Sequence, residues 1–226
     1  MPHPSPLLRT FARHWMKPLT LAALLAPGVW IFVQWALMLS GQPHAMGFNP
    51  VEYTHRFLGD TAIRILLVSL AVSPVRDLTG WAPIMLVRRR IGLAAFFYAA
   101  LHILAYLWLD KMWSLRALLE DVALRKYITF GMIAFLLLVP LAVTSTNGMI
   151  RRLGRKTWER LHWLVYPLAI LAVLHHLFMV KGDQPEPLVH GAILAALLIW
   201  RIGKRIASLR PGPPRRGETA TARSAR

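Results

Sequence analysis

Three histidines lie within a strongly apolar stretch, ERLHWLVYPLAILAVLHHLFMV, which covers residues 159–180. They are His162, His175 and His176, and a fourth histidine, His102, lies in a second apolar stretch. An ionisable side chain inside a membrane is costly and usually marks a functional site, and neutral imidazole is a common metal ligand. These histidines therefore predict a metal or cofactor site, although any one of them could instead form a hydrogen bond between helices.

Six apolar runs are long enough to hold such a site within a membrane, because crossing about 30 Å of hydrocarbon takes about 20 apolar residues. The chain has 226 residues, of which 56% are hydrophobic and only 16% are charged, and its mean hydropathy is +0.45. The predicted spans are 19–39, 57–75, 91–109, 128–145, 161–180 and 188–203. They predict an all-α integral membrane protein that folds as a six-helix transmembrane bundle.

The basic residues predict how these spans are oriented. Twenty of the 27 Lys and Arg residues fall in the N-terminal segment, the second and fourth loops and the C-terminal tail, whereas most acidic residues fall in the other loops. Cytoplasmic loops collect Lys and Arg, so both termini are expected in the cytoplasm. This asymmetry also accounts for the net charge of +17 and argues against a nucleic-acid partner.

The positions of the apolar runs and of the basic residues divide the chain into three parts. Residues 1–18 are expected to form a cytoplasmic N-terminal segment, and residues 19–205 to form the transmembrane domain. The tail, 206–226, is rich in Pro, Gly and Arg, which predicts a disordered cytoplasmic segment close to anionic membrane lipid. Residues 113–124 have a helical spacing of apolar residues and are expected to lie along the outer membrane surface.

Several kinds of redox site are excluded by the residues that the chain lacks. The absence of cysteine excludes disulfides, cysteine-held iron–sulfur clusters and covalent attachment of haem. Neither G-x-G-x-x-G nor G-x-x-x-x-G-K-[ST] occurs, so the chain has no recognisable dinucleotide or ATP motif. Any haem must be bound non-covalently, and reducing equivalents must come from another molecule.

His102 and His175 lie at nearly equal depth in their spans. They precede the span ends Leu109 and Val180 by seven and five residues, which corresponds to about 10 Å and about 8 Å of helix rise. Because both spans run in the same direction, the two imidazoles can face one another across the bundle. Two imidazoles on opposite sides of one iron predict a six-coordinate, low-spin b-type haem, which suits electron transfer.

Two ambiguities remain in this interpretation. His162 lies thirteen residues before His175, a rise of about 20 Å that suits a second cofactor, but the third span carries arginines where a matching histidine would be needed. On a straight helix, His176 rather than His175 would share a face with His162. Pro167 can kink the helix and makes straight-helix directions unreliable, so both the haem count and the choice of ligand stay open.

Three segments carry a resemblance to a known family: RRRIGLAAFFYAALHILAYL at 88–107, TSTNGMIRRLGRKTWERLHWLVY at 144–166 and LAILAVLHH at 168–176. They resemble the MsrQ/YedZ family, the haem-binding membrane subunits of the bacterial periplasmic methionine sulfoxide reductase system. This family belongs to the ferric-reductase-like transmembrane superfamily. The resemblance covers about residues 60–205 and implies a ferric-reductase-like transmembrane domain in the cell inner membrane of a bacterium.

The resemblance also implies cofactors, partners and site residues. It implies that His102, His162 and His175 bind haem, with His175 preferred over His176 because the family places thirteen residues between its two histidines on this helix. One haem b is implied, a second is left open, and FMN and quinone are implied as electron carriers. The donor would be a quinone or a cytosolic flavin reductase, and the acceptor a periplasmic molybdopterin-containing reductase subunit. The chain would then be an electron-transfer subunit rather than the catalytic one.

Two other classes of function compete with this interpretation. A self-contained ferric or quinone-linked reductase would use the same haem, although the missing nucleotide motifs argue against direct reduction by NADPH. A proton or ion transporter would use the histidines as proton or ion ligands. Interrupted helices in matching halves would favour transport, and the prolines of this chain show no such matching pattern.

Overall fold

Every regular element is helical in the part of the chain that the computed structural model describes, which is residues 14–180 and 184–209. The long helices are α2 (Met16–Leu39), α3 (Pro50–Thr79), α4 (Met85–Ala105), α6 (Lys126–Val143), α9 (Val165–Met179) and α10 (Glu186–Leu209). The short ones are η1 (Ala82–Ile84), the π-helical turn η2 (Tyr106–Asp110), α5 (Leu115–Leu124), α7 (Asn147–Leu153) and α8 (Arg155–His162). The expected all-α fold class is confirmed.

Five helical stretches among these residues are long and apolar enough to cross a membrane. They are Met16–Leu39, Pro50–Thr79, Ala82–Asp110, Lys126–Val143 and Arg155–Met179. These stretches coincide with the first five expected spans, so the chain is a multi-pass membrane protein. The sixth expected span, 188–203, lies within α10, which is not one of the five. A crossing by α10 therefore stays a prediction.

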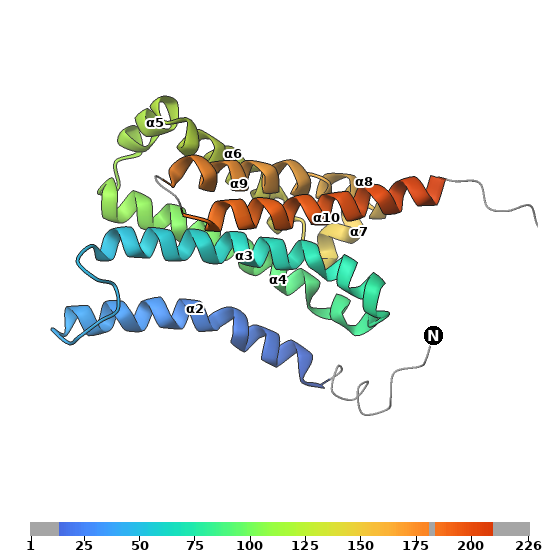
Figure 1. Ribbon diagram of the computed structural model, residues 1–226, viewed down its shortest axis with the longest axis horizontal. Helices are drawn as coiled ribbons and strands as arrows, with labels where there is room; N and C mark the ends of the chain where they lie inside the picture. The colour runs from blue at the N-terminus through green and yellow to red at the C-terminus, as the bar shows by residue number, and fades with distance from the viewer. Residues whose placement is uncertain (1–13, 181–183, 210–226) are drawn as a thin grey trace, which may run out of the picture.

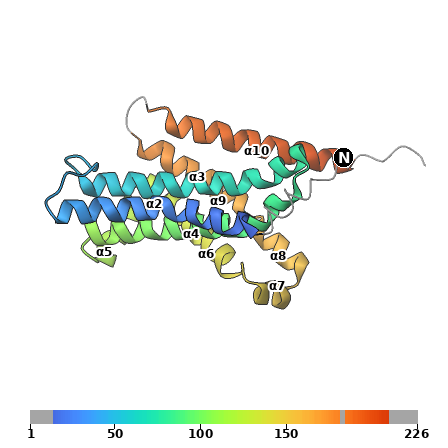
Figure 2. The ribbon, with the colours of Figure 1, turned by 90° about the horizontal axis from the view of Figure 1, so that it is seen from below.

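The long helices alternate in direction. Figure 1 shows α2, α4 and α9 running toward the same end of the bundle, and α3, α6 and α10 running back, and Figure 2 shows the same order from a second side. We call the end at which α4 and α9 finish the distal end; it is on the left in Figure 1. α3 packs against α4, α6 packs against α9, and α10 packs against both α3 and α9. Because α4 and α9 run in the same direction, His102 and His175 both lie toward the distal end, as their nearly equal depth in the spans requires.

The core lies where α3, α4, α6 and α9 meet. Leu70, Ala95 and Leu168 are each at most 2% exposed, and all belong to one buried apolar cluster. Large apolar side chains also face outward, for example Phe32 on α2 and Ile199 on α10, which are 74% and 69% exposed. Such a surface suits lipid, which is as apolar as these side chains.

Local signals explain where α3 begins and ends. Asn49 caps the first turn by accepting a hydrogen bond from the Glu52 amide, and Pro50 occupies the first helical position, where its missing N–H costs nothing. The helix ends at Gly80, whose φ of 70° is the left-handed conformation that glycine adopts without a steric penalty. The start of α3 is therefore fixed at the distal end of the bundle.

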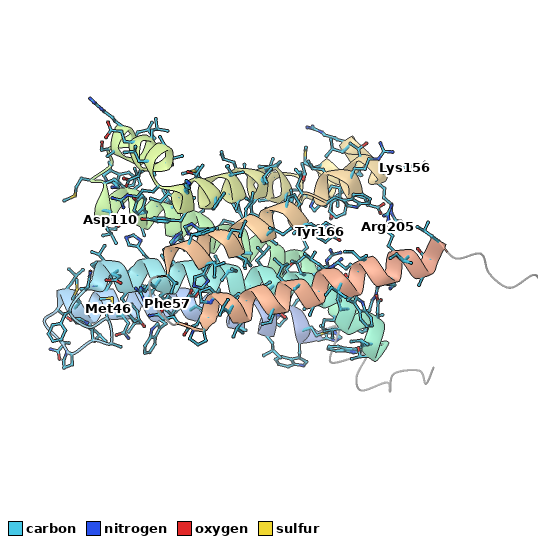
Figure 3. All side chains as sticks on the ribbon, turned by 45° about the horizontal axis from the view of Figure 1, so that its top comes forward. Met46, Phe57, Asp110, Lys156, Tyr166 and Arg205 are labelled. Carbon is cyan, nitrogen blue, oxygen red and sulfur yellow. The ribbon has the colours of Figure 1, made fainter. Side chains whose placement is uncertain are left out.

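Pro74 in α3 frees a carbonyl group that contacts α10. Because proline has no N–H, the Leu70 carbonyl four residues earlier loses its helical partner. The Arg201 guanidinium of α10 donates to that oxygen at 2.7 Å and also donates to the Tyr166 hydroxyl at 3.1 Å. One side chain thus links α3, α9 and α10 in the half of the bundle away from the distal end, where Figure 3 labels Tyr166.

The hydroxyl of Tyr98 holds α2 against α4. It accepts a hydrogen bond from the Gly28 amide at 2.8 Å and donates to the Leu24 carbonyl at 2.7 Å, so it is inserted between two groups that would normally pair within α2. Pro27, next to this point, already removes one amide from the α2 ladder. The Tyr98 hydroxyl therefore joins α4 to α2 at the point where the backbone hydrogen bonding of α2 is interrupted.

We expect Tyr98→Phe to destabilise the protein by about 1–3 kcal/mol, the cost of leaving a buried amide or carbonyl without a partner. Thermal unfolding in detergent would show this as a lower midpoint temperature. Tyr53→Phe is the matched control, because the Tyr53 hydroxyl only accepts one long, exposed bond of 3.4 Å from Trp30. Equal midpoint temperatures for the two variants would contradict the proposed role of Tyr98.

Two helix boundaries differ in detail from the sequence expectations. Within the span expected over 161–180, in which Pro167 was expected to allow a kink, the chain turns at Trp163 and Leu164 between α8 and α9. Pro167 explains the break, since it lacks the amide that would bond to the carbonyl of Trp163. The tail was expected from residue 206, but α10 continues through Leu209.

The expected terminal segments lie mostly outside the described residues, which leave out 1–13 and 210–226. The expected surface helix at 113–124 is present as α5, which begins at an N-cap formed by Ser114, whose side chain accepts from the Ala117 amide. Leu115 and Leu119 of α5 are 61% and 60% exposed, so an apolar side of this helix is open to its surroundings at the distal end.

Candidate cofactor site

A cavity of about 300 Å³ lies between α3, α4, α6 and α9, in the distal half of the bundle. Its walls are mostly apolar, and both His102 and His175 line it. Ligand pockets in proteins occupy about 300–1,000 Å³ and combine apolar walls with a few polar groups. This cavity has both properties, and the helix pairs α3–α4 and α6–α9 supply its two sides.

The two histidines face one another across this cavity. The centroids of the His102 and His175 rings are 6.2 Å apart, with 72° between the ring planes. Imidazole–metal bonds of about 2.0–2.1 Å on opposite sides of one ion place the two ring centroids roughly 6 Å apart. The separation of the rings therefore suits two axial ligands of a single metal.

Backbone carbonyl groups hold both rings by their Nδ1 atoms. Nδ1 of His102 donates to the His55 carbonyl at 3.1 Å, and Nδ1 of His175 donates to the Tyr127 carbonyl at 2.6 Å. A carbonyl oxygen only accepts, so the proton must sit on Nδ1 and leave the Nε2 lone pair free. Metal-binding histidines are almost always held in this way.

Glycine residues allow the neighbouring helices to approach both rings. A Cβ atom on Gly131 of α6 would lie 2.8 Å from Nδ1 of His175, and a Cβ atom on Gly59 of α3 would lie 3.3 Å from Cε1 of His102. The first distance is too short for any real contact, and the second is tight. A side chain at Gly131 would therefore displace the His175 ring, and a side chain at Gly59 would crowd the His102 ring.

A third imidazole, that of His55, lies at the distal rim of the cavity. Its ring meets that of His102 edge-on with centroids 6.1 Å apart, and the distance to the Tyr106 ring is 5.8 Å. Nε2 lies 2.5 Å from a carboxylate oxygen of Asp110, a charge contact that lacks hydrogen-bond geometry, and Nδ1 has no hydrogen-bond partner. Figure 3 labels Asp110 at this end of the bundle.

The short helix α5 is tied to the same rim through Asp121. This buried carboxylate accepts from the Lys111 ammonium and from the Tyr106 hydroxyl, and Nε of Arg125 lies 3.3 Å from it. Lys111, with Tyr106 next in importance, holds the pKa of Asp121 below its usual range. The side chain of Leu118 reaches from α5 into the cavity wall, so α5 covers part of the distal rim.

His176 lines the same cavity but makes contacts of a different kind. Its Nδ1 lies 3.2 Å from Nδ1 of His190 on α10, and its Nε2 lies 3.5 Å from a carboxylate oxygen of Asp60 on α3. Both of its ring nitrogens thus have polar neighbours on other helices. Of the two adjacent histidines, His175 is the one that faces His102.

His162 is not brought to this cavity. It is the last residue of α8, its Nδ1 donates to the Trp158 carbonyl at 3.0 Å, and its ring stacks on the Trp158 ring with centroids 3.8 Å apart. Trp158 in turn donates to the Thr144 carbonyl at the end of α6. His162 therefore lies at the end of the bundle away from the distal rim, and a role for it in haem binding stays a prediction.

The two glycines beside the rings were not singled out from the sequence, and His55 was expected only in a solvated or interfacial role. A glycine inside an otherwise apolar helix lowers helix stability and often has a packing or functional reason. The sequence carried that signal at Gly59 and Gly131. No sequence pattern points to His55, because only the fold brings this residue of α3 beside the end of α4.

The residues around the cavity fit a haem held by two histidines. The rings are correctly separated, their Nε2 atoms are free, the glycines leave room beside them, and the walls are apolar. The two rings come from α4 and α9, the two glycines from α3 and α6, and the carbonyl groups that hold the rings from His55 and Tyr127. The arrangement could hold one iron between two imidazoles.

Known proteins are similar in sequence to this chain over most of its length. Residues 58–173 match the family described as ferric reductase like transmembrane component. The protein-methionine-sulfoxide reductase heme-binding subunit MsrQ of Xanthomonas campestris pv. campestris is 47% identical over 189 residues, which cover 84% of this chain and 86% of that protein. The protein of the same name from Rhodospirillum rubrum is 50% identical over 167 residues, which cover 74% of this chain and 80% of that protein.

Proposed function

Because the chain belongs to the MsrQ family of haem-binding subunits, with a ferric-reductase-like transmembrane domain, we propose that it conducts electrons across the membrane through one b-type haem. The donor is a quinone or a flavin, and the acceptor is a molybdopterin-containing methionine sulfoxide reductase on the periplasmic side. The protein is an electron-transfer subunit and leaves catalysis to its partner. Bound between two histidines, a haem supplies one-electron transfer rather than oxygen chemistry.

The pair formed by His102 and His175 carries this proposal. Each side chain comes from a different helix, each has its Nδ1 proton held by a carbonyl group, and the ring centroids are 6.2 Å apart. A histidine with a purely structural role in the core would need only the hydrogen bond from its Nδ1, and not a second histidine ring opposite it. Their combination supports His102 and His175 as the axial ligands and His176 as a supporting residue.

The chain's own residues also explain why electrons would leave at the distal end. The cavity reaches a rim formed by His55, Tyr106 and Asp110, so its occupant lies near the surface to which α4 and α9 run. The outer segments 41–56 and 181–187 would then belong to the docking surface of the partner. Of these residues, 181–183 lie outside the described part of the chain.

An absorption spectrum of the purified protein, oxidised and dithionite-reduced, tests the proposal. We expect a low-spin b-type spectrum and one haem per chain by pyridine haemochrome count, because His102 and His175 form the only facing histidine pair among residues 14–180 and 184–209 whose rings have both Nδ1 atoms held by carbonyls. His162→Ala should keep this haem and lose electron entry from the quinone or flavin. A protein expressed with adequate haem that shows no Soret band would contradict the proposal.

Reporter fusions test the proposed orientation in the inner membrane, with both termini in the cytoplasm. Fusions after Pro43 and after Asp183 should report the periplasm, and fusions after Thr79 and after Gly154 should report the cytoplasm. The distribution of Lys and Arg supports this result, as does the position of the start of α2 and the end of α10 at the same end of the bundle (Figure 1). A cytoplasmic signal after Asp183 would be the contrary outcome.

A further inference from the structure

The cavity is polar at one end and apolar at the other. Its distal rim carries His55, Arg56, Asp110 and Arg125, all of which line it. The opposite end is lined by apolar side chains that come later along α3 and α6 or earlier along α4 and α9, among them Leu66, Ala95, Leu138 and Leu168. A ligand whose polarity matched this lining would have one charged edge and one apolar edge.

The acidic groups on the cavity wall already have cationic or imidazole neighbours. Asp110 lies 2.5 Å from Nε2 of His55. Asp60 lies 3.6 Å from the Arg64 guanidinium and 3.5 Å from Nε2 of His176. The acidic side chains that face the cavity therefore do not need the rim arginines as partners.

The rim arginines use only part of their hydrogen-bonding capacity. Arg56 contacts Glu52 through one terminal nitrogen at 2.8 Å. Arg125 contacts Asp121 through Nε at 3.3 Å and donates to the Tyr127 hydroxyl at 3.3 Å. Since a guanidinium group has five N–H donors, both retain donors for an anion. The two side chains come from α3 and from the α5–α6 junction, so they approach the rim from different sides.

We propose that this rim is a carboxylate-binding site in which Arg56 and Arg125 hold the propionate groups of the haem. The inference rests on the proposed function, because it takes the occupant of the cavity to be haem. Haem has two propionates on one edge and apolar substituents on the other, which matches the polarity of the cavity. Arginine binds carboxylates through paired hydrogen bonds. The buried Nδ1 of His55, which has no hydrogen-bond partner, lies at the same edge.

This assignment gives the haem a direction. Its charged edge faces the distal rim, and its apolar edge faces the buried cluster around Leu168. The propionates would then lie at the end of the bundle where the partner is proposed to dock. The same arginines would raise the midpoint potential of the haem, since positive charge close to the iron favours its reduced form.

Haem b and haem dimethyl ester, in which both propionates are masked, test this inference in the full-length protein. We expect the wild-type protein to bind haem b roughly tenfold more tightly than the ester, a preference that one or two partly exposed charge-assisted hydrogen bonds can supply. In Arg56→Gln/Arg125→Gln, we expect the two dissociation constants to become equal within about threefold. The affinity for the ester should not change, which also shows that the variant is folded.

Arg116→Gln is the matched control. Arg116 is an exposed residue of α5 that pairs with Glu120 at 2.9 Å, as Arg56 pairs with Glu52, but it does not line the cavity. It should keep the wild-type preference for haem b. The midpoint potential with haem b should fall in the double variant and stay unchanged in the control.

Two results would overturn the inference. In the first, the double variant keeps the wild-type preference for haem b, which would place the propionates elsewhere. In the second, its affinity for haem b and for the ester falls equally, which would mean that the arginines support the fold and not the propionates. Failure of the proposed function looks different, because neither compound would then give a six-coordinate spectrum in the wild-type protein.

Discussion

Alanine in place of His102 or of His175 is expected to abolish the low-spin haem spectrum. The two rings lie 6.2 Å apart across the cavity, and each is proposed to supply one axial nitrogen, so either change would leave one axial position without a protein ligand. Loss of even a hydrogen-bond partner of a metal ligand costs about 10–100-fold in affinity. We therefore expect at least a roughly tenfold loss of bound haem per chain, measured from the Soret band and the haemochrome count.

The adjacent histidine provides the matched control. His176→Ala removes the same group one position along α9, but its nitrogens lie beside Asp60 and His190 and not opposite His102. We expect a shifted spectrum that is still six-coordinate. The opposite pattern, with His175→Ala unaffected and His176→Ala without haem, would assign the α9 ligand to His176 and would contradict the geometry described above.

A single methyl group at position 131 is expected to have an effect almost as large. In Gly131→Ala, the new Cβ atom would lie 2.8 Å from Nδ1 of His175, closer than real Cβ contacts allow, and 3.0 Å from Cε1, which is already tight. Both clashing atoms belong to the ring, which is also fixed by its bond to the Tyr127 carbonyl. The ring must move away from the axial position, so we expect loss of the six-coordinate spectrum without removal of any ligand.

Alanine substitutions at two other glycines serve as controls for this result. A Cβ atom at Gly203 on α10 meets nothing within 4 Å, so Gly203→Ala should leave the spectrum unchanged and slightly stabilise the helix. Gly59→Ala places its Cβ atom 3.3 Å from the His102 ring and should have an intermediate effect. If Gly131→Ala bound haem as the wild-type protein does, the ring of His175 could not occupy the position described here.

Much of the fold was determined by the sequence alone. Apolar length sets the spans, because each helix satisfies its own backbone hydrogen bonds and needs only lipid or a neighbouring helix around it. The first five spans follow from this rule, and the spacing of residues 113–124 predicted α5. The approximate depth of His102 and of His175 also follows from counting residues, since an α-helix rises about 1.5 Å per residue.

Tertiary structure decided which atoms meet. The carbonyl groups that hold His102 and His175 come from residues 47 and 48 positions away, and a local pattern carries no information about such pairs. The choice between His175 and His176 depends on how far α9 is rotated about its axis. That rotation follows from the break before Pro167 and from the close approach of α6 at Gly131. A one-residue step turns a helical side chain by about 100°, so depth is readable from sequence, whereas direction is fixed only by packing.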